Sequence, residues 1–322
     1  MTPRRSLPAF SNRRPAGFSL TEVLVALSIT SIVVLAVGSA FVFVVRGWTD
    51  SDARLAAQQN LRTGVEEFYR EVRLTGTCLL PSATTPPANF KPLDGSYSGG
   101  AGTDTLTVQS NTKCAIGTLI ALNPCNACTT ISLDNVNNFA AGMYAYIYQA
   151  NSLPPRGEPF VVLSVNAAAK TLAVTPKPPA PYTITQNYSA DSTNGYSSVY
   201  GLEQRMYQIT TIGGVPTLTM TTLNTAATPI AKGIEKLGIT YTLNRVYQAS
   251  PSCDAQTGGS PNLCVVNLPG SAADWQLVRS VTVILGARST GRVRGAGGDG
   301  YLHLSEIFQI TPRNFVFMIT RL

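Results

Sequence analysis

The sequence predicts an α+β protein in which one long N-terminal helix, membrane-spanning in its first half, packs on an antiparallel β-sheet head. Three features indicate this class. Residues 18–45 form a mainly apolar run with one charged residue, a glutamate, and residues 47–75 are amphipathic and contain no proline. From Thr105 onward, β-branched and tyrosine-rich runs alternate with turn residues. Only 13% of the 322 residues are charged and 44% are hydrophobic, which excludes a disordered chain.

The apolar run from Phe18 to Val45 is long enough to span a bilayer. As a helix it would measure roughly 42 Å at ~1.5 Å per residue, whereas a hydrocarbon core is about 30 Å thick. Arginines precede the run, and positive charge before a membrane segment keeps that end in the cytoplasm. We therefore expect the N-terminus to stay in the cytoplasm and the head to lie on the other side of the membrane.

The positive net charge is largely a feature of the N-terminus. The chain carries +7, and four of these charges come from Arg4, Arg5, Arg13 and Arg14, so removal of residues 1–17 would leave +3. A charge excess confined to the start of the chain gives little reason to expect nucleic acid as a partner.

Glu22 is the only charged residue in the apolar run. A carboxylate in a membrane segment is costly, and such residues usually have a partner. Either Glu22 reaches the headgroups, or it meets a positive charge when the protein assembles with others.

The segment that contains Glu22 resembles the class III signal of type IV prepilins: Arg13-Arg14-Pro15-Ala16-Gly17-Phe18-Ser19-Leu20-Thr21-Glu22. The resemblance implies that a prepilin peptidase cuts after Gly17 and that Phe18 is then N-methylated. It also implies that Glu22 pairs with the terminal amine of a neighbouring subunit. The competing interpretation is an ordinary secretory signal cleaved at small residues near Ala40, but the apolar run continues beyond that point.

Residues 47–76 predict that the helix continues out of the membrane with one buried stripe. Apolar residues recur at near-helical spacing among charges, and a glycine supplies the stop; the stripe is Leu55, Leu61, Val65, Phe68 and Val72. The segments 58–62 and 71–76 are similar to PilW-like minor pilins. This family is related to the J-type pseudopilins of type II secretion.

We expect residues 77–322 to form the β-rich head, with an inserted β-rich subdomain at about 105–200, and residues 81–103 to form a loop. The segments 139–147 and 160–165 resemble the subdomain often inserted in PilW-like proteins. The predicted strands are Thr105–Gln109, Met143–Gln149, Pro159–Val165, Thr171–Thr175, Gln204–Thr211, Thr217–Thr222, Gly238–Asn244, Leu277–Leu285 and Leu302–Ile310.

Six cysteines in an exported chain indicate disulfides. We expect Cys253 and Cys264 to bridge across a polar turn, and Cys78 and Cys114 form a second candidate pair. The spacing alone does not fix the connectivity, because six cysteines allow 15 pairings.

Cys125 and Cys128 are the closest cysteine pair. A zinc site of this type needs a second close pair, and a redox pair needs a βαβ context. Neither is visible in the sequence, so both cysteines are candidates for structural disulfides, and we expect no metal and no cofactor.

Two further features bear on alternative functions. His303 is the only histidine, so a Ser-His-Asp site would have to use it. The sequence has no nucleophile motif to go with it. We therefore expect His303 to be an exposed strand residue and the protein not to be an enzyme.

The glycine-rich run 286–300 contains Arg288, Arg292 and Arg294. These arginines could contact DNA, although a solvated hairpin loop is the favoured interpretation.

Together these features favour a minor pilin that primes assembly of a type IV pilus and lies at or near its tip. The resemblance implies as partners other minor pilins, the major pilin, the prepilin peptidase and the inner-membrane assembly platform. The alternatives are a tip adhesin or DNA-binding module, a J-like pseudopilin of type II secretion, and an exported enzyme.

Overall fold

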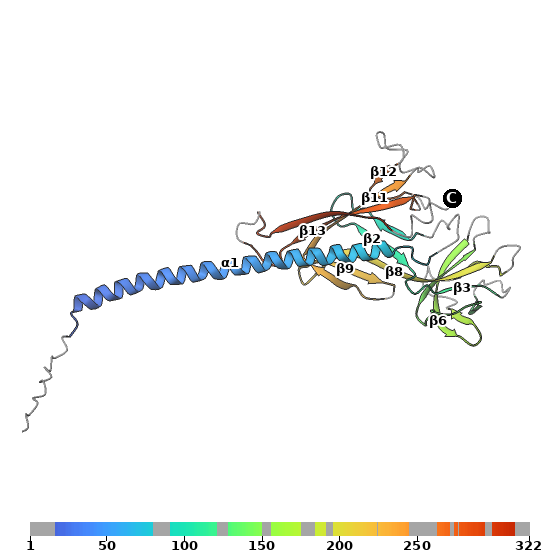
Figure 1. The fold of residues 1–322 in the computed structure, drawn as a ribbon, viewed down its shortest axis with the longest axis horizontal. Helices are drawn as coiled ribbons and strands as arrows, with labels where there is room; N and C mark the ends of the chain where they lie inside the picture. Colours follow the sequence, from blue (N-terminus) through green and yellow to red (C-terminus); the bar gives the residue numbers. More distant parts are fainter. Residues whose placement is uncertain are drawn as a thin grey trace, which may run out of the picture. The chain divides into compact units, whose positions relative to one another are not determined.

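The computed structural model describes residues 17–79, 91–120, 128–149, 156–174, 184–190, 196–223, 225–244, 263–270, 274–275, 277–293 and 298–312. The chain divides into two compact units, Met1–Asp52 and Ala53–Leu322, and the helix α1 (Leu20–Leu74) runs from the first into the second. Strands β1 to β14 all follow α1 in the sequence (Figure 1). The α+β class predicted from the sequence is thus confirmed.

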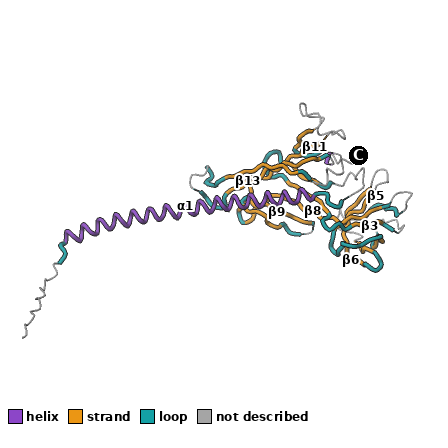
Figure 2. The backbone as a smooth tube through the Cα atoms, viewed as in Figure 1, coloured by secondary structure: helices purple, strands orange, loops and turns teal. Residues whose placement is uncertain are grey.

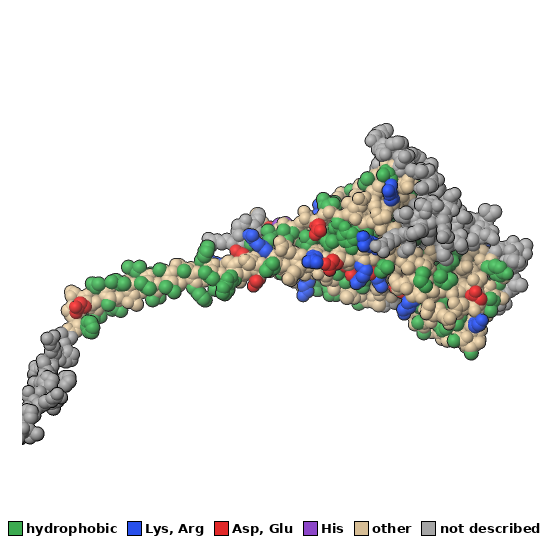
Figure 3. All heavy atoms as spheres, in the orientation of Figure 1, with side chains coloured by type: hydrophobic (Ala, Val, Ile, Leu, Met, Phe, Trp, Pro, Cys, Tyr) green, Lys and Arg blue, Asp and Glu red, His purple; other side chains and the backbone are tan. Residues whose placement is uncertain are grey.

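The first part of α1 exposes its apolar side chains, and Figure 3 shows them along one face of the helix. From Ser28 to Ser39 its hydroxyl groups are satisfied within the helix, because each donates to a carbonyl three or four residues back, as Ser28 does to Leu24 at 2.8 Å and Thr30 to Ala26 at 2.7 Å. No proline interrupts it. By length and composition, α1 is the one helix in the described part of the chain that could cross a membrane.

The end of α1 matches the predicted stop. The helix ends at Leu74, and Gly76 follows in the left-handed region with φ of 76°, a conformation that glycine adopts without steric cost. The N–H group of Gly76 donates to the carbonyl of Gln109 at 2.9 Å, so the chain leaves the helix attached to the strand that contains Gln109.

Among the described residues, ten strands form the first sheet, in the order β1-β2-β8-β5-β6-β7-β4, with β3 and β9 also on β8 and β10 on β9. All pairings are antiparallel. The strands are β1 (Leu93–Ser96), β2 (Thr105–Ser110), β3 (Ile116–Thr118), β4 (Thr130–Ser132), β5 (Tyr144–Gln149), β6 (Arg156–Asn166), β7 (Thr171–Val174), β8 (Ser197–Ile212), β9 (Val215–Thr222) and β10 (Thr228–Lys232).

In the part of the chain that the structure describes, the second sheet has four strands in the order β12-β11-β13-β14, again all antiparallel. Its strands are β11 (Ile234–Asn244), β12 (Leu263–Val266), β13 (Val278–Arg288) and β14 (His303–Ile310).

Residues 53–74 of α1 pack between the two sheets, and Figure 2 shows this part of the helix between β13 and β9. A Cβ at Gly64 would lie 3.2 Å from Leu285 of β13 and 3.6 Å from Leu218 of β9, so this position allows the helix to approach both sheets closely. Two aromatic contacts continue the packing: Phe68 with Tyr207 of β8 and Tyr69 with Phe308 of β14.

The predicted buried stripe of α1 is confirmed except at one end. Leu61, Val65, Phe68 and Val72 are buried, but Leu55 is exposed. In this part of the helix the buried residue is Ala57, two positions after Leu55.

The long strand β8 connects two hydrophobic cores. Its residues 203–212 pair with β2 and β9 beside α1, and its residues 197–202 pair with β3 and β5. The second core takes its residues from Ala115 to Val199. These lie within the expected insertion at about 105–200, but β2 at its start contributes to the core that contains α1.

All nine predicted strands are present, with ends shifted by up to seven residues at β8. Five strands were not predicted: β1, β3, β4, β10 and β12. Most are three or four residues long, too short to show a clear alternation. The expectation of a loop over residues 81–103 is wrong at β1, which pairs with β2.

A buried ion network attaches α1 to β8. Glu71 is 2% exposed, and its carboxylate binds Arg205 of β8 and, at 2.9 Å, Arg70 of the helix. Arg70 also binds Glu67 at 2.7 Å, and the hydroxyl of Tyr207 donates to Glu67 at 2.9 Å. Each buried charge therefore has an opposite charge or a hydrogen-bond donor, as burial requires.

Candidate processing and assembly site

The bond between Gly17 and Phe18 lies outside the helix. Residues 17–19 have no regular secondary structure, and Phe18 is 87% exposed. A Cβ at Gly17 would meet no other atom within 4 Å. The fold of this chain therefore does not itself require glycine at position 17.

Glu22 has a partner within its own chain. Its carboxylate accepts hydrogen bonds from the backbone N–H of Ser19 at 2.9 Å and from the Ser19 hydroxyl at 3.1 Å. In return, the N–H of Glu22 donates to the Ser19 hydroxyl at 3.2 Å. This reciprocal arrangement is a capping box, which satisfies free N–H groups at the start of a helix.

The sequence interpretation missed this cap, although the spacing Ser19-x-x-Glu22 carries its signature. It treated Glu22 as a lone charge whose partner comes from another subunit. The structure provides a local partner that is neutral, so the negative charge itself is not compensated by a cation in the described part of the chain.

Cys78 and Cys114 form a disulfide with Cα atoms 5.2 Å apart, in agreement with the second expected pair. The bond links the turn after α1 to the connection between β2 and β3. It closes a loop with a sequence separation of 36 residues, for which chain entropy alone gives a stabilisation of roughly 4 kcal/mol.

Cys128 and Cys264 each take part in a disulfide as well. Cys125 and Cys253 lie outside the described residues, so the expected Cys253–Cys264 bridge stays a prediction. None of the described cysteines is free.

His303 lies on β14 as an exposed residue, as predicted, with both ring nitrogens next to carboxylates. Its Nδ1 contacts Glu235, and its Nε2 is 2.9 Å from Asp299. Neither nitrogen is placed to accept a proton from a nucleophile. The hydrogen bond with Glu235, followed by that with Asp299, raises the pKa of His303 above its usual 6.5.

The sign of this shift sets a pH dependence. Only the doubly protonated imidazole donates to both carboxylates, so its contribution to stability is complete below pH 6.5 and is lost as the pH rises through the raised pKa. Asp299 determines how this part of the structure responds to low pH. The N–H of Tyr301, with a smaller part from His303, lowers its pKa, so its contribution is lost as the pH falls through that lowered value.

We expect a single histidine resonance that titrates above pH 6.5, because His303 is the only histidine in the chain. The measurement is an NMR titration of the full chain in detergent micelles, purified without a histidine tag. Glu235→Gln should move the midpoint down toward 6.5. A parental midpoint at or below 6.5 would contradict the contacts described.

Of the three arginines proposed to contact DNA, the structure describes two, and these lie against adjacent residues of the chain, Gly300 and Tyr301. Arg288 lies 4.7 Å from the ring centroid of Tyr301, Arg292 is exposed next to Gly300, and Arg294 lies outside the described part.

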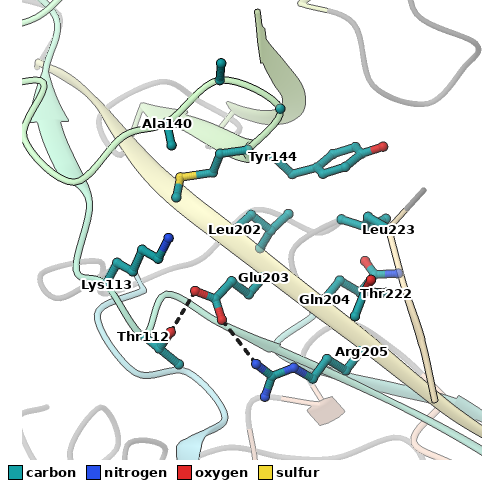
Figure 4. Close-up of a pocket in the computed structure, with 13 residues that line it drawn as sticks. Thr112, Lys113, Ala140, Tyr144, Leu202, Glu203, Gln204, Arg205, Thr222 and Leu223 are labelled. Atoms are coloured by element: carbon teal, nitrogen blue, oxygen red, sulfur yellow. Dashed lines mark hydrogen bonds and ion pairs between the residues drawn. The ribbon is translucent and has the colours of Figure 1, made fainter. Parts of the chain in front are cut away.

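A cleft of about 580 Å³ lies where β8 meets the loops at 112–113 and 140–144 (Figure 4). Lys113 and Met143 line it, and so does Glu203, whose carboxylate accepts from Thr112 at 2.6 Å and lies 3.4 Å from Arg205. None of the residues predicted from the sequence to be functional lies in this cleft. Among the described residues, no group of three or more His, Cys, Asp or Glu side chains could hold a metal ion.

Comparison with known families gives one match, to the prokaryotic N-terminal methylation motif, over residues 12–38. It covers residues 12–17 of the predicted leader, the Gly17–Phe18 bond, Glu22 and much of the apolar half of α1. Comparisons with curated proteins and with solved structures return no match.

The methylation motif and the fold support a type IV pilin-like protein, a class that contains pilins and pseudopilins. Such a motif implies membrane association and partners from the same assembly system. It also supports anchoring in the inner membrane before assembly.

Proposed function

We propose that the protein is a minor pilin of the PilW-like type, which primes assembly of a type IV pilus and lies at or near its tip. The observation that carries the proposal is the methylation motif at the start of a helix that is apolar first and then packs on a β-rich head. In this proposal the protein is structural and not an enzyme.

The chemistry of the N-terminus supports a role in assembly. Cleavage after Gly17 would create a positively charged amine on Phe18, four residues before Glu22. In lipid, a carboxylate without a cation is costly, and the Ser19 cap compensates it only with neutral donors. Packing helices side by side would bring the amine of one subunit to Glu22 of the next, and this pairing would favour the assembled state over the isolated subunit.

The test is a chromosomal deletion in the source bacterium, complemented with the parent chain. We expect surface pili to fall strongly in number and to return on complementation, while type II secretion continues. An epitope-tagged chain should label filament ends. Labelling along the filament would contradict the tip location, and loss of secretion with normal pili would favour a J-like pseudopilin.

The tip adhesin or DNA-binding alternative makes a separate prediction about the complemented strain. Substituting Arg288 and Arg292 with alanine should leave piliation unchanged and reduce DNA uptake or attachment only if this alternative holds. The interactions of Arg288 with Tyr301 and of the loop with Asp299 favour a structural role for this region.

A further inference from the structure

The cleft beside β8 has the size and the mixed lining of a ligand site. Its volume is about 580 Å³, and ordinary small-molecule sites measure about 300–1,000 Å³ and combine apolar walls with a few polar groups that orient the ligand. The apolar side chains of this cleft come from β5, from β8 and from single residues next to β5 and β9: Met143, Tyr144, Leu202 and Leu223. A ligand that fits this lining carries an apolar group.

Three charged side chains line the cleft, and two of them compensate each other. The Glu203 carboxylate accepts from the Thr112 hydroxyl at 2.6 Å and lies 3.4 Å from Arg205. Arg205 also binds the buried Glu71. Lys113 makes no hydrogen bond or ion pair in the described part of the chain, and no dashed line reaches it in Figure 4. Among the described lining residues, Lys113 is therefore the cation that can bind an anion.

The loop that carries Lys113 is held in place before any ligand binds. Asn111 is 1% exposed, and its side-chain amide donates to the carbonyls of Cys78 at 3.1 Å and Ala115 at 3.0 Å. Its Oδ1 accepts from the N–H of Ala115 at 3.0 Å. Cys114, the residue after Lys113, is joined to Cys78 by the disulfide. A site that is ordered in advance loses less conformational entropy when a ligand binds.

The segment that carries Met143 is fixed as well. The N–H of Gly142 donates to the carbonyl of Val162 at 2.8 Å, and the N–H of Val162 donates to the carbonyl of Met143 at 2.9 Å. A Cβ at Gly201 of β8 would lie 3.1 Å from the Met143 sulfur and 3.0 Å from Oδ1 of Asn111. Glycine at position 201 therefore allows both lining segments to pack closely on β8.

We propose that the cleft binds an organic carboxylate that carries an apolar group, as the C-terminal residue of a peptide does. The carboxylate pairs with the Lys113 ammonium, and the apolar group lies against Met143, Leu202 and Leu223. One uncompensated positive charge matches a monovalent anion, because the Glu203 carboxylate in the same lining repels further negative charge. The flexible thioether side chain of Met143 adapts to apolar groups of different shape. The proposal does not depend on the pilus function, because the site lies within one chain.

The test is a titration of the full chain, in micelles of a non-ionic detergent, with N-acetyl-leucine as the probe. The readout is the NMR spectrum of isotope-labelled methionine methyl groups. The chain has five methionines, and comparison with Met143→Leu assigns the Met143 signal. We expect this signal to shift and to reach saturation. N-acetyl-leucinamide, which has the same apolar group without the negative charge, should cause no saturable shift.

Substitutions at Lys113 test the charge directly. Lys113→Gln should weaken binding of N-acetyl-leucine roughly threefold to fivefold, the effect of an exposed ion pair, whereas Lys113→Arg should bind as the parent does. Lys232→Gln removes an exposed lysine that does not line the cleft and should leave binding unchanged. The absence of a saturable Met143 shift, an equal shift with the amide, or equal binding by Lys113→Gln and the parent would each overturn the proposal.

A second probe distinguishes the two sources of such a carboxylate. N-acetyl-glycyl-alanyl-leucine has the same terminal group on a short peptide. Tighter binding of this tripeptide than of N-acetyl-leucine would support the proposal with a peptide C-terminus as the ligand. Equal or weaker binding of the tripeptide, with N-acetyl-leucine still bound through Lys113, would support it with a small free carboxylate as the ligand.

Discussion

Replacing Glu22 by glutamine is expected to reduce incorporation of the protein into filaments at least about tenfold. Glutamine serves in a capping box as glutamate does, so the start of α1 should be preserved. The substitution removes only the charge, and truncating a charge pair buried in an interface costs roughly 2–5 kcal/mol, which corresponds to a factor of ten or more. The measurement is the amount of protein in sheared filaments relative to the amount in membranes.

Ser19→Ala is the matched control for this prediction. It removes the hydroxyl that contacts both the N–H and the carboxylate of Glu22 but retains the charge. Loss of a cap costs the helix about 1 kcal/mol, so incorporation should fall much less than in the glutamine variant. If Ser19→Ala were as defective as Glu22→Gln, Glu22 would act through the cap and not through a cation on a neighbouring subunit.

Replacing Glu71 by alanine is expected to lower the free energy of unfolding of the head by about 3–5 kcal/mol, because it removes the buried carboxylate that joins Arg205 of β8 to Arg70 of α1. Glu71 is 2% exposed and binds Arg205 and Arg70. At roughly 2–4 °C per kcal/mol for a unit of this size, the melting temperature of the full chain in detergent should fall by on the order of 10 °C. Circular dichroism in the aromatic region, where the buried Trp275 absorbs, follows the transition.

Glu66→Ala on the same helix provides the comparison. Glu66 binds Arg62 at 2.8 Å, but the side chains are 65% and 82% exposed. Exposed pairs contribute at most about 1 kcal/mol, so this variant should melt close to the parent. Equal melting temperatures for Glu66→Ala and Glu71→Ala would contradict the role assigned to the buried network.

The helix α1 and nine strands were predictable from the sequence because their hydrophobic patterns repeat over several residues. The apolar run, the stripe that includes Phe68, and alternations such as Val281–Leu285 each extend over several residues. The short strands β3 and β4 form because β8 and β7 offer them backbone partners, and local sequence does not reveal such partners.

The site was predictable where it depends on local spacing and not where it depends on contacts across the chain. Gly17, Phe18 and Glu22 stand in one short motif. Glu71, by contrast, lies in a charged run that suggested an exposed face. Its burial depends on Arg205, 134 residues later.

Mass spectrometry of the mature N-terminus, with Gly17 intact and with Gly17→Leu, tests the central claim of prepilin processing most directly. Because a side chain at position 17 meets nothing in the fold, the substitution should affect the peptidase and not the structure. The account predicts a chain that begins with methylated Phe18 in the parent and an uncleaved leader in the variant. A mature chain that begins near Phe41, or the same processing in both proteins, would contradict it.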